Sequence, residues 1–541
     1  MAMTGAQAMV KCLEREGVQV AFGYPGAAIC PFYDALLDSN IRHVLVRTEQ
    51  NAAHAASGYA RISGKPGVCI ATSGPGATNL LTGIASAYMD SIGLVVITGQ
   101  VRSDLLGRDV FQEADITGAA EPFTKHSYLV KNPIDIPRIM KEAFHIASTG
   151  RPGPVLIDVP IDMQKAEIGD FDYDTPVDII GYKPNSQGHS LQIRKAIQAI
   201  QSSKRPVICA GGGVFSAKAR KELRQFAEQC RIPVICTMMG IGALPSDHEL
   251  NMGMLGTHGC IPANKAIRDA DLVILAGARV GDRAVAAPDQ VAERATIIHI
   301  DIDPAEIGKN MPAHIPIVGD LKLVLKELIK DCDWQAPEDW VNQVTDRKAR
   351  YSIPKTSPEE GYVEPKLFMR ALSRKMRPDS ILCADVGQNQ IWSANNFTVS
   401  EGFFLTSGGM GTMGYSIPSA VGAKMASPGR QVCAICGDGS FQMSMMELGT
   451  ICQQNLGVKI VVMRNTRLGM VRELQDNQYK GRHNAVYLDG SPDFVSIAKA
   501  YGIKALSISS DREVEAAIDE MLKDDKPFLL VCNVNPGYPS L

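Results

Sequence analysis

The chain has 541 residues, with 55 basic and 58 acidic side chains and a net charge of −3. Apolar residues make up 45% and charged residues 21%, as in ordinary globular proteins, so a disordered or fibrous chain is excluded. The balanced charge, without a basic run, argues against a nucleic-acid partner. At about 150 residues per domain the length predicts about three or four domains, which excludes a small binding module.

Thirteen cysteines are scattered through apolar stretches, a pattern typical of reduced, buried thiols in a cytoplasmic protein. Cys433 and Cys436 have the spacing of a metal-binding pair, but alternation on a buried strand explains them better than zinc does, because no second pair accompanies them. No apolar run approaches the roughly 18 residues of a membrane span, and the first residues do not resemble a signal peptide. We therefore expect a cytoplasmic protein without a membrane partner.

Short apolar runs alternate along the chain with longer helical patterns, which is typical of parallel sheets covered by helices on both faces. The predicted strands include residues 68–71, 94–97, 154–157, 272–275, 432–436 and 459–463. Polar, turn-rich connections at 165–190 and 331–365 interrupt this alternation. The sequence predicts an α/β protein with three doubly wound parallel-sheet domains, at 1–170, 191–340 and 362–541.

The strongest local signal is Gly437-Asp438-Gly439-Ser440, which follows the strand 432–436 and precedes a helical pattern. The backbone N–H groups of such a turn favour a bound anion. A carboxylate beside an anion is expected if a divalent cation such as Mg²⁺ bridges the two. Asn465 ends the next buried strand, and the carboxyl ends of parallel strands face one crevice, so Asp438 and Asn465 can share one ion. Two ordinary strand-to-helix turns are the alternative.

This motif resembles the cofactor-binding motif of thiamine-diphosphate enzymes. The whole chain resembles the catalytic subunits of the acetolactate synthase family, on the stretches 23–26, 72–79, 111–113, 124–126, 150–155, 299–303, 385–388 and 406–414. The resemblance implies thiamine diphosphate and Mg²⁺, with Mg²⁺ bound by Asp438, Asn465 and the backbone carbonyl of Arg467. The other contacts it implies are Gln388, Asn389 (in place of a usual histidine), Gly411, Met413, Gly437, Gly439, Ser440, Leu468, Gly469 and Met470. A core-filling role is the alternative for Met413.

In the first domain, we expect Glu49 at the end of a strand over 41–49, where it matches the family's activating glutamate and shares a proton with the cofactor's aminopyrimidine ring. The residues alone leave open an ion pair of Glu49 with Arg47 or Arg61. Gln112 is expected at the reaction centre, where a neutral amide can hydrogen-bond a reacting carbonyl. The other catalytic candidates are Gly26, Phe111 beside the substrate channel, and Lys125, for which a solvated surface position is the alternative.

The middle domain carries glycines and acids at predicted strand ends, a pattern that favours a dinucleotide crevice. The resemblance implies FAD there, contacted by Arg151, Gly212, Thr237, His258, Gly277, Arg279, Arg283, Asp301 and Asp320. In this family the flavin does no net redox work. Related thiamine enzymes keep the domain without FAD, so the residues leave this cofactor open.

The resemblance implies a carboligase of branched-chain amino-acid biosynthesis. It would release CO₂ from pyruvate and transfer the remaining two-carbon unit to a second 2-oxoacid, pyruvate or 2-oxobutyrate. In the family Glu49 and the diphosphate site come from different subunits, which implies at least a homodimer; a homotetramer and a small regulatory subunit stay open. The alternatives are a decarboxylase, oxidase or hydrolase on the same scaffold and a regulatory protein without catalysis.

Four residues depart from the common family pattern: Ala27, Ile161, Arg464 and Leu474. Leu474 replaces a tryptophan that lines the second-substrate pocket and favours 2-oxobutyrate over pyruvate. Because less apolar surface is offered to the acceptor, we expect a weaker preference for 2-oxobutyrate. Arg464 should not disturb the metal, since Asn465 is the ligand.

Overall fold

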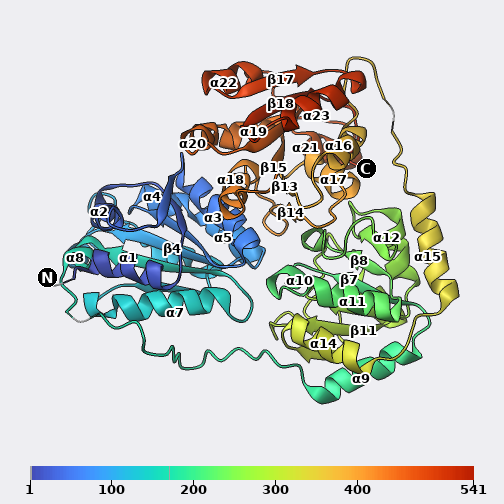
Figure 1. Cartoon of the computed structure of the whole chain (residues 1–541), viewed down its shortest axis with the longest axis horizontal. Helices are drawn as coiled ribbons and strands as arrows, with labels where there is room; N and C mark the ends of the chain where they lie inside the picture. The colour runs from blue at the N-terminus through green and yellow to red at the C-terminus, as the bar shows by residue number, and fades with distance from the viewer. Residues whose placement is uncertain (1–2, 170, 357) are drawn as a thin grey trace.

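The computed structural model describes residues 3–169, 171–356 and 358–541. These residues form three parallel sheets of six strands each, and Figure 1 shows them as three lobes, with the first sheet at the left, the second at the lower right and the third above. The predicted α/β class with three doubly wound sheets is confirmed. Residues 1, 2 and 170, at the ends of the predicted first domain, and residue 357, in the second connection, lie outside the described residues.

The first sheet has the strand order β2-β1-β3-β4-β6-β5. Its strands are β1 (Val20–Gly23), β2 (Arg42–Leu45), β3 (Gly67–Ala71), β4 (Leu94–Gln100), β5 (His126–Leu129) and β6 (Pro154–Pro160). Its helices are α1 (Gly5–Arg15), α2 (Cys30–Leu36), α3 (Glu49–Ser63), α4 (Pro75–Asn79), α5 (Leu81–Met89), α6 (Ile116–Ala120), α7 (Ile136–Ser148) and α8 (Ile161–Lys165). The strand order reverses between β1 and β3, which places a crevice at their carboxyl ends.

The second sheet has the order β12-β11-β10-β7-β8-β9. Its strands are β7 (Pro206–Ala210), β8 (Val234–Cys236), β9 (Asn251–Met254), β10 (Leu272–Ala276), β11 (Thr296–Asp301) and β12 (Ile315–Val318). Its helices are α9 (Ser190–Ser202), α10 (Gly213–Ser216), α11 (Arg220–Cys230), α12 (Ile261–Asp269), α13 (Pro288–Arg294), α14 (Leu321–Asp331) and α15 (Glu338–Arg350). Numbered along the chain, this is the 3-2-1-4-5-6 order of dinucleotide-binding sheets, with its crevice between β7 and β10.

The third sheet, β14-β13-β15-β16-β18-β17, repeats the connectivity of the first. Its strands are β13 (Ile381–Ala384), β14 (Phe403–Leu405), β15 (Val432–Gly437), β16 (Val458–Arg464), β17 (Lys504–Ile508) and β18 (Phe528–Asn533). Its helices are α16 (Pro365–Lys375), α17 (Gln388–Asn396), α18 (Ser416–Ala426), α19 (Asp438–Ser444), α20 (Leu448–Gln453), α21 (Gly469–Tyr479), α22 (Phe494–Ala500) and α23 (Val514–Leu522). Cys433 and Cys436 are buried free thiols on β15, as the strand interpretation predicted.

Helix α3 of the first domain packs closely against α18 of the third, and the two lie side by side in Figure 1. Small residues permit this approach, because a methyl group at Gly58 would overlap the carbonyl oxygen of Ser419. Buried Glu447 adds a polar contact by accepting hydrogen bonds from the backbone N–H of Arg47 (2.8 Å) and from Nδ2 of Asn51 (3.0 Å). The start of α3 is therefore held in place by the third domain. Among the described residues, no helix is both long and apolar enough to cross a membrane.

Candidate active site

Glu49 is the first residue of helix α3 rather than the end of a strand. The strand expected over 41–49 is shorter in the structure, since β2 ends at Leu45. Thr48 ends the extended segment by capping the helix, and its hydroxyl accepts a hydrogen bond from the backbone N–H of Asn51 (3.4 Å). A carboxylate in the first turn of a helix is stabilised by the helix dipole. The expected strand therefore stops before Glu49, which begins the helix.

The Glu49 side chain faces the turn that follows β3. Its Oε2 accepts a hydrogen bond from Nδ2 of Asn79 (3.0 Å), and a methyl group at Gly76 would lie 3.2 Å from its Oε1. The two arginines considered as ion-pair partners bind elsewhere. Arg47 donates to a carbonyl of β2 and to a glutamine of α20, and Arg61 donates to carbonyls of the 404–406 segment. Glu49 is therefore left available to a ligand.

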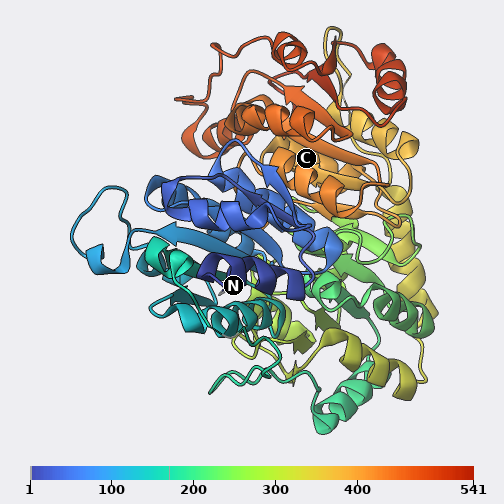
Figure 2. The same ribbon diagram turned by 60° about the vertical axis from the view of Figure 1, so that its left-hand side comes forward.

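Gly26 and Gln112 lie at the same edge of the first sheet. A methyl group at Gly26 would lie 2.5 Å from Cγ2 of Thr72, and one at Gly74 would lie 2.9 Å from Cα of Gln112. Gln112 has a φ of +58°, a left-handed conformation that concentrates at functional sites when a side chain is present. The neighbouring Phe111 is 87% exposed, on the segment after β4 that extends away from its domain in Figure 2.

Lys125 has a different setting from the other catalytic candidates. Its Nζ donates to the carbonyl oxygens of Ile146 (2.5 Å) and Thr149 (2.7 Å) and to the hydroxyl of Tyr182 (2.8 Å). Burial lowers the pKa of Lys125 to about 8. A cation is favourable at the carboxyl end of a helix, here α7. These contacts give Lys125 a capping position and do not join it to Glu49 or Gln112.

Asp438 and Asn465 meet at the carboxyl ends of β15 and β16, where Gly437 pairs with Met463. The backbone N–H of Thr466 donates to Oδ2 of Asp438 (2.6 Å). The Oδ1 of Asn465 accepts from the backbone N–H of Arg467 (3.0 Å). Thr466 has a φ of +56°, so this turn holds a strained backbone between the two side chains. The structure therefore brings the predicted metal ligands to one strand edge.

The other predicted thiamine contacts surround this edge. Gln388, at the start of α17, accepts from Nδ2 of Asn465 (3.0 Å). The neighbouring Asn389 donates to the carbonyl oxygen of Asp385 (2.8 Å). A methyl group at Gly439 would lie 2.9 Å from Cδ2 of Leu468 and 3.4 Å from Cε of Met413, so apolar side chains lie beside the turn that carries Asp438. Of the remaining predicted contacts, Gly437 and Ser440 flank Asp438, Gly469 and Met470 begin α21, and Gly411 lies in the segment that leads to Met413.

A cavity of about 530 Å³ lies at the β7–β10 crevice of the second sheet. Its lining includes eight of the predicted flavin contacts: Arg151, Gly212, Thr237, His258, Gly277, Arg279, Arg283 and Asp301. Asp320, the ninth, caps α14 beside an adjoining cavity that shares Gly277 and Asp301. This volume and the dinucleotide-type strand order fit a flavin dinucleotide. Burial raises the pKa of Asp301 to about 6.

Arg151 joins the first domain to this cavity. Its guanidinium donates to Oε1 of Glu306 (2.7 Å) and to Oγ of Ser91 (2.8 Å), and it lies 3.5 Å from Oδ2 of Asp303. The predicted flavin contact is therefore also an ion pair between the first and second domains.

Comparisons with known proteins cover nearly the whole chain. The thiamine pyrophosphate enzyme N-terminal TPP binding domain matches residues 3–119, the central domain 193–328 and the C-terminal TPP binding domain 385–532. The chain is 47% identical to a probable acetolactate synthase large subunit of Methanocaldococcus jannaschii, over 99% of this chain and 92% of that protein. It is 46% identical to the acetolactate synthase large subunit of Corynebacterium glutamicum, over 98% and 86% respectively. The chain belongs to the acetolactate synthase family of thiamine pyrophosphate enzymes.

For this acetolactate synthase family member, the third domain fits a bound Mg²⁺. Asp438 is 1% exposed, and burial raises its pKa to about 6. Its carboxylate accepts hydrogen bonds from the backbone amides of Gly439 and Thr466. The described residues hold no group of three or more His, Cys, Asp or Glu side chains that could bind a metal. Mg²⁺ needs no such group, since it is held by one or two carboxylates together with other oxygens and phosphates.

Two residues with clear structural roles were not assigned from the sequence. Asn79 holds Glu49, and Asp385 holds the segment that carries Met413 by accepting from the backbone N–H groups of Gly414 and Ser416 (both 2.8 Å). Asp385 directly follows the buried strand β13. The pattern that pointed to Asp438, a carboxylate at the end of a buried strand, therefore also applies to Asp385. No local signal pointed to Asn79, because its partner lies on another helix.

Proposed function

We propose that the protein is an acetolactate synthase that joins two 2-oxoacids with loss of CO₂. Two pyruvate ions and one proton would give one 2-acetolactate ion and one CO₂, and 2-oxobutyrate as acceptor would give the ethyl homologue. The observation that carries this proposal is the 43–47% identity to acetolactate synthases over nearly the whole chain. The matched N-terminal and C-terminal domains contain Glu49 and Asp438 respectively.

Thiamine diphosphate, when bound, supplies the nucleophile and the electron acceptor for the decarboxylation. Glu49 would hold and return a proton at a ring nitrogen of the cofactor, a role worth about 10²–10⁴ in rate. Gln112 would donate a hydrogen bond to a reacting carbonyl. Asp438, Asn465 and the carbonyl oxygen of Arg467 would hold Mg²⁺ and so position the diphosphate.

The active site is proposed to form between two copies of the chain, with Glu49 from one and Asp438 from the other. Large apolar side chains left uncovered near the candidate site support this: Phe111 is 87% exposed, Met443 54% and Met410 46%. Exposed apolar side chains of this kind are available to an interface with another molecule.

Mixing two inactive variants tests this arrangement. Glu49→Gln and Asp438→Ala chains are co-refolded in equal amounts, so half of the dimers should contain one chain of each kind. In such a mixed dimer, one of the two shared sites has both residues intact. About a quarter of wild-type activity should return, as expected for random pairing in a twofold dimer. If both residues served the same site from one chain, the mixture would stay inactive and the shared-site proposal would fail.

Product analysis tests the reaction itself. With pyruvate, Mg²⁺, thiamine diphosphate and FAD, trapping should yield 2-acetolactate and CO₂. Acetaldehyde or acetyl phosphate in its place would assign the chain to a decarboxylase or an oxidase. Flavin absorbance of the purified protein tests the proposed FAD site, which is supported by the cavity at the β7–β10 crevice.

The acceptor preference is proposed to be weak. Leu474 lies on α21 with 47% of its surface exposed, and it offers less apolar contact to a bound acceptor than an indole ring would. Competition between pyruvate and 2-oxobutyrate should show little bias; a strong bias toward 2-oxobutyrate would contradict this.

We also propose a partner subunit and a cellular location for the protein. Relatives are named large subunits, which supports a small regulatory subunit as a partner. All thirteen cysteines are free thiols, which supports a reducing, cytoplasmic location. Co-purification with a small subunit and a thiol titration of the native protein test these two proposals.

A further inference from the structure

The segment 407–414, called the glycine loop here, reaches both cofactor regions. Gly408 and Gly409 line the cavity proposed for the flavin. At the other end of the loop, the Cε atom of Met413 lies 3.4 Å from the position of a methyl group built at Gly439, in the Asp438 turn. One short piece of backbone therefore borders the flavin cavity and the thiamine site of the same chain.

Asp90 of the first domain holds the beginning of the glycine loop. Its Oδ1 accepts from the backbone N–H of Gly409 (2.7 Å) and its Oδ2 from that of Gly408 (3.1 Å). Four residues earlier, Oγ of Ser86 hydrogen-bonds Oγ of Ser407 (3.0 Å), and the latter atom also accepts from the backbone N–H of Thr412 (3.1 Å). The first domain thus supplies two polar side chains to a loop of the third domain.

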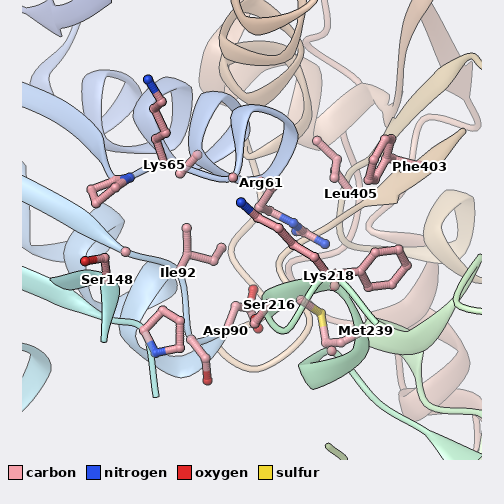
Figure 3. Close-up of a pocket in the computed structure, with 18 of the residues that line it drawn as sticks. Arg61, Lys65, Asp90, Ile92, Ser148, Ser216, Lys218, Met239, Phe403 and Leu405 are labelled. Atoms are coloured by element: carbon pink, nitrogen blue, oxygen red, sulfur yellow. The ribbon is translucent and has the colours of Figure 1, made fainter. Parts of the chain in front are cut away.

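The second domain closes the other side of Gly408. A methyl group at Gly408 would overlap Sδ of Met239, so this glycine lies between Met239 and Asp90. Figure 3 shows Asp90 and Met239 around a small cavity of about 150 Å³ where the three domains meet. The third domain contributes Phe403 and Leu405 to the same cavity. All three domains therefore meet at the start of the glycine loop.

The end of the glycine loop is held separately by Asp385, through the backbone N–H of Gly414. Between the two carboxylates the loop has few contacts. Met410 is 46% exposed, and Gly411 has a φ of +68° with open space at the position that a Cβ would take. Segments with so few buried contacts are the first to lose order, so the order of this loop depends on its two ends.

We propose that Asp90 couples the two cofactor sites through the glycine loop. A flavin in the adjoining cavity holds Gly408 and Gly409 against Asp90, which orders the loop and strengthens thiamine-diphosphate binding in the same chain. This inference rests on the proposed binding of FAD. Coupling between binding sites is reciprocal, so thiamine diphosphate strengthens flavin binding by the same factor. Couplings of this kind commonly amount to about 5–150-fold.

Calorimetry on the full chain, stripped of cofactors, tests the coupling. The dissociation constant (Kd) of thiamine diphosphate with Mg²⁺ is measured with and without saturating FAD, and FAD should lower it about fivefold or more. In Asp90→Asn this ratio should fall toward one, because a carboxamide accepts through one oxygen and its NH₂ group opposes the second amide donor. The matched control is Asp493→Asn. The Asp493 carboxylate likewise accepts a hydrogen bond from a backbone N–H, that of Val495 (3.0 Å), but it is distant in sequence from the glycine loop.

The results separate the coupling from the proposed FAD binding and from the role of Asp90. If FAD binds but leaves the Kd of thiamine diphosphate unchanged, the coupling is overturned while the proposed function stands. If the stripped chain does not bind FAD at all, the flavin assignment falls and the coupling with it. If Asp90→Asn keeps the wild-type ratio, the coupling does not run through Asp90. Should Asp90→Asn fail to fold by circular dichroism, the wild-type chain still decides, because a Kd of thiamine diphosphate that FAD leaves unchanged overturns the coupling.

Discussion

Replacing Glu49 with glutamine separates proton transfer from structure at the proposed active site. The carboxylate accepts one hydrogen bond, from Nδ2 of Asn79. A glutamine can keep that bond through its own carbonyl oxygen, while its NH₂ group takes the position beside Gly76. The fold therefore loses little beyond the favourable charge in the first turn of α3, worth about 0.3–1 kcal/mol.

The expected kinetic loss is much larger than the structural one. A general acid or base contributes about 10²–10⁴ in rate, which corresponds to about 3–5 kcal/mol of activation free energy. A stability loss of about 1 kcal/mol moves Tm by about 2–4 °C in domains of this size. Glu49→Gln should therefore lower kcat at least about a hundredfold with a shift in Tm of a few degrees.

The assay measures acetolactate formation at saturating cofactors, together with the Kd of thiamine diphosphate and thermal unfolding by circular dichroism. The matched control is Glu14→Gln, because Glu14 also accepts a single side-chain hydrogen bond, from Oγ of Ser39 (2.8 Å), at an exposed site. A Glu49→Gln enzyme with wild-type kcat would refute the reasoning. Equal losses of turnover and cofactor binding would assign Glu49 to binding rather than to proton transfer.

Asp438→Ala removes a proposed Mg²⁺ ligand, so calorimetry should show Mg²⁺ and thiamine diphosphate bound about tenfold more weakly or worse, and unchanged binding would contradict the metal site. Burial raises the pKa of Asp158 to about 7, from about 3.9 in the unfolded chain. The folded state then binds more protons between these values, so the free energy of unfolding falls as pH rises from about 4 to 7, and Asp158→Asn should show a shallower fall in Tm. Gly422→Ala places a methyl group on the carbonyl oxygen of Ala55 where α3 crosses α18. Gly422→Ala should lower the free energy of unfolding by about 1–3 kcal/mol, measured by thermal unfolding. Gly429→Ala should not, because the added methyl group would lie in open space.

Much of the fold and half of the candidate site follow from local sequence patterns. Strands buried on both faces must be apolar throughout, so β3, β10 and β15 stand out as uninterrupted apolar runs. Asp438 and Asn465 directly follow two such runs, and neighbouring parallel strands end at one edge. The sequence analysis placed Glu49 in a strand, whereas it begins a helix. Thr48 caps that helix and so ends the extended segment, and hydrophobic periodicity does not detect such a cap.

The sequence by itself determined the three-domain α/β plan, the strand edge that carries Asp438 and Asn465, and the family resemblance, because each depends on residues close together in the chain or on recurring motifs. Only the tertiary structure decided which polar side chains already have hydrogen-bond partners within the chain. Lys125 bonds the end of α7, Arg151 bonds Glu306, and Asp90 bonds Gly408, 318 positions away. Such partners depend on how α3 packs on α18 and how three sheets meet. Hydrophobic periodicity records which face of an element is buried, but not which distant backbone group it will meet there.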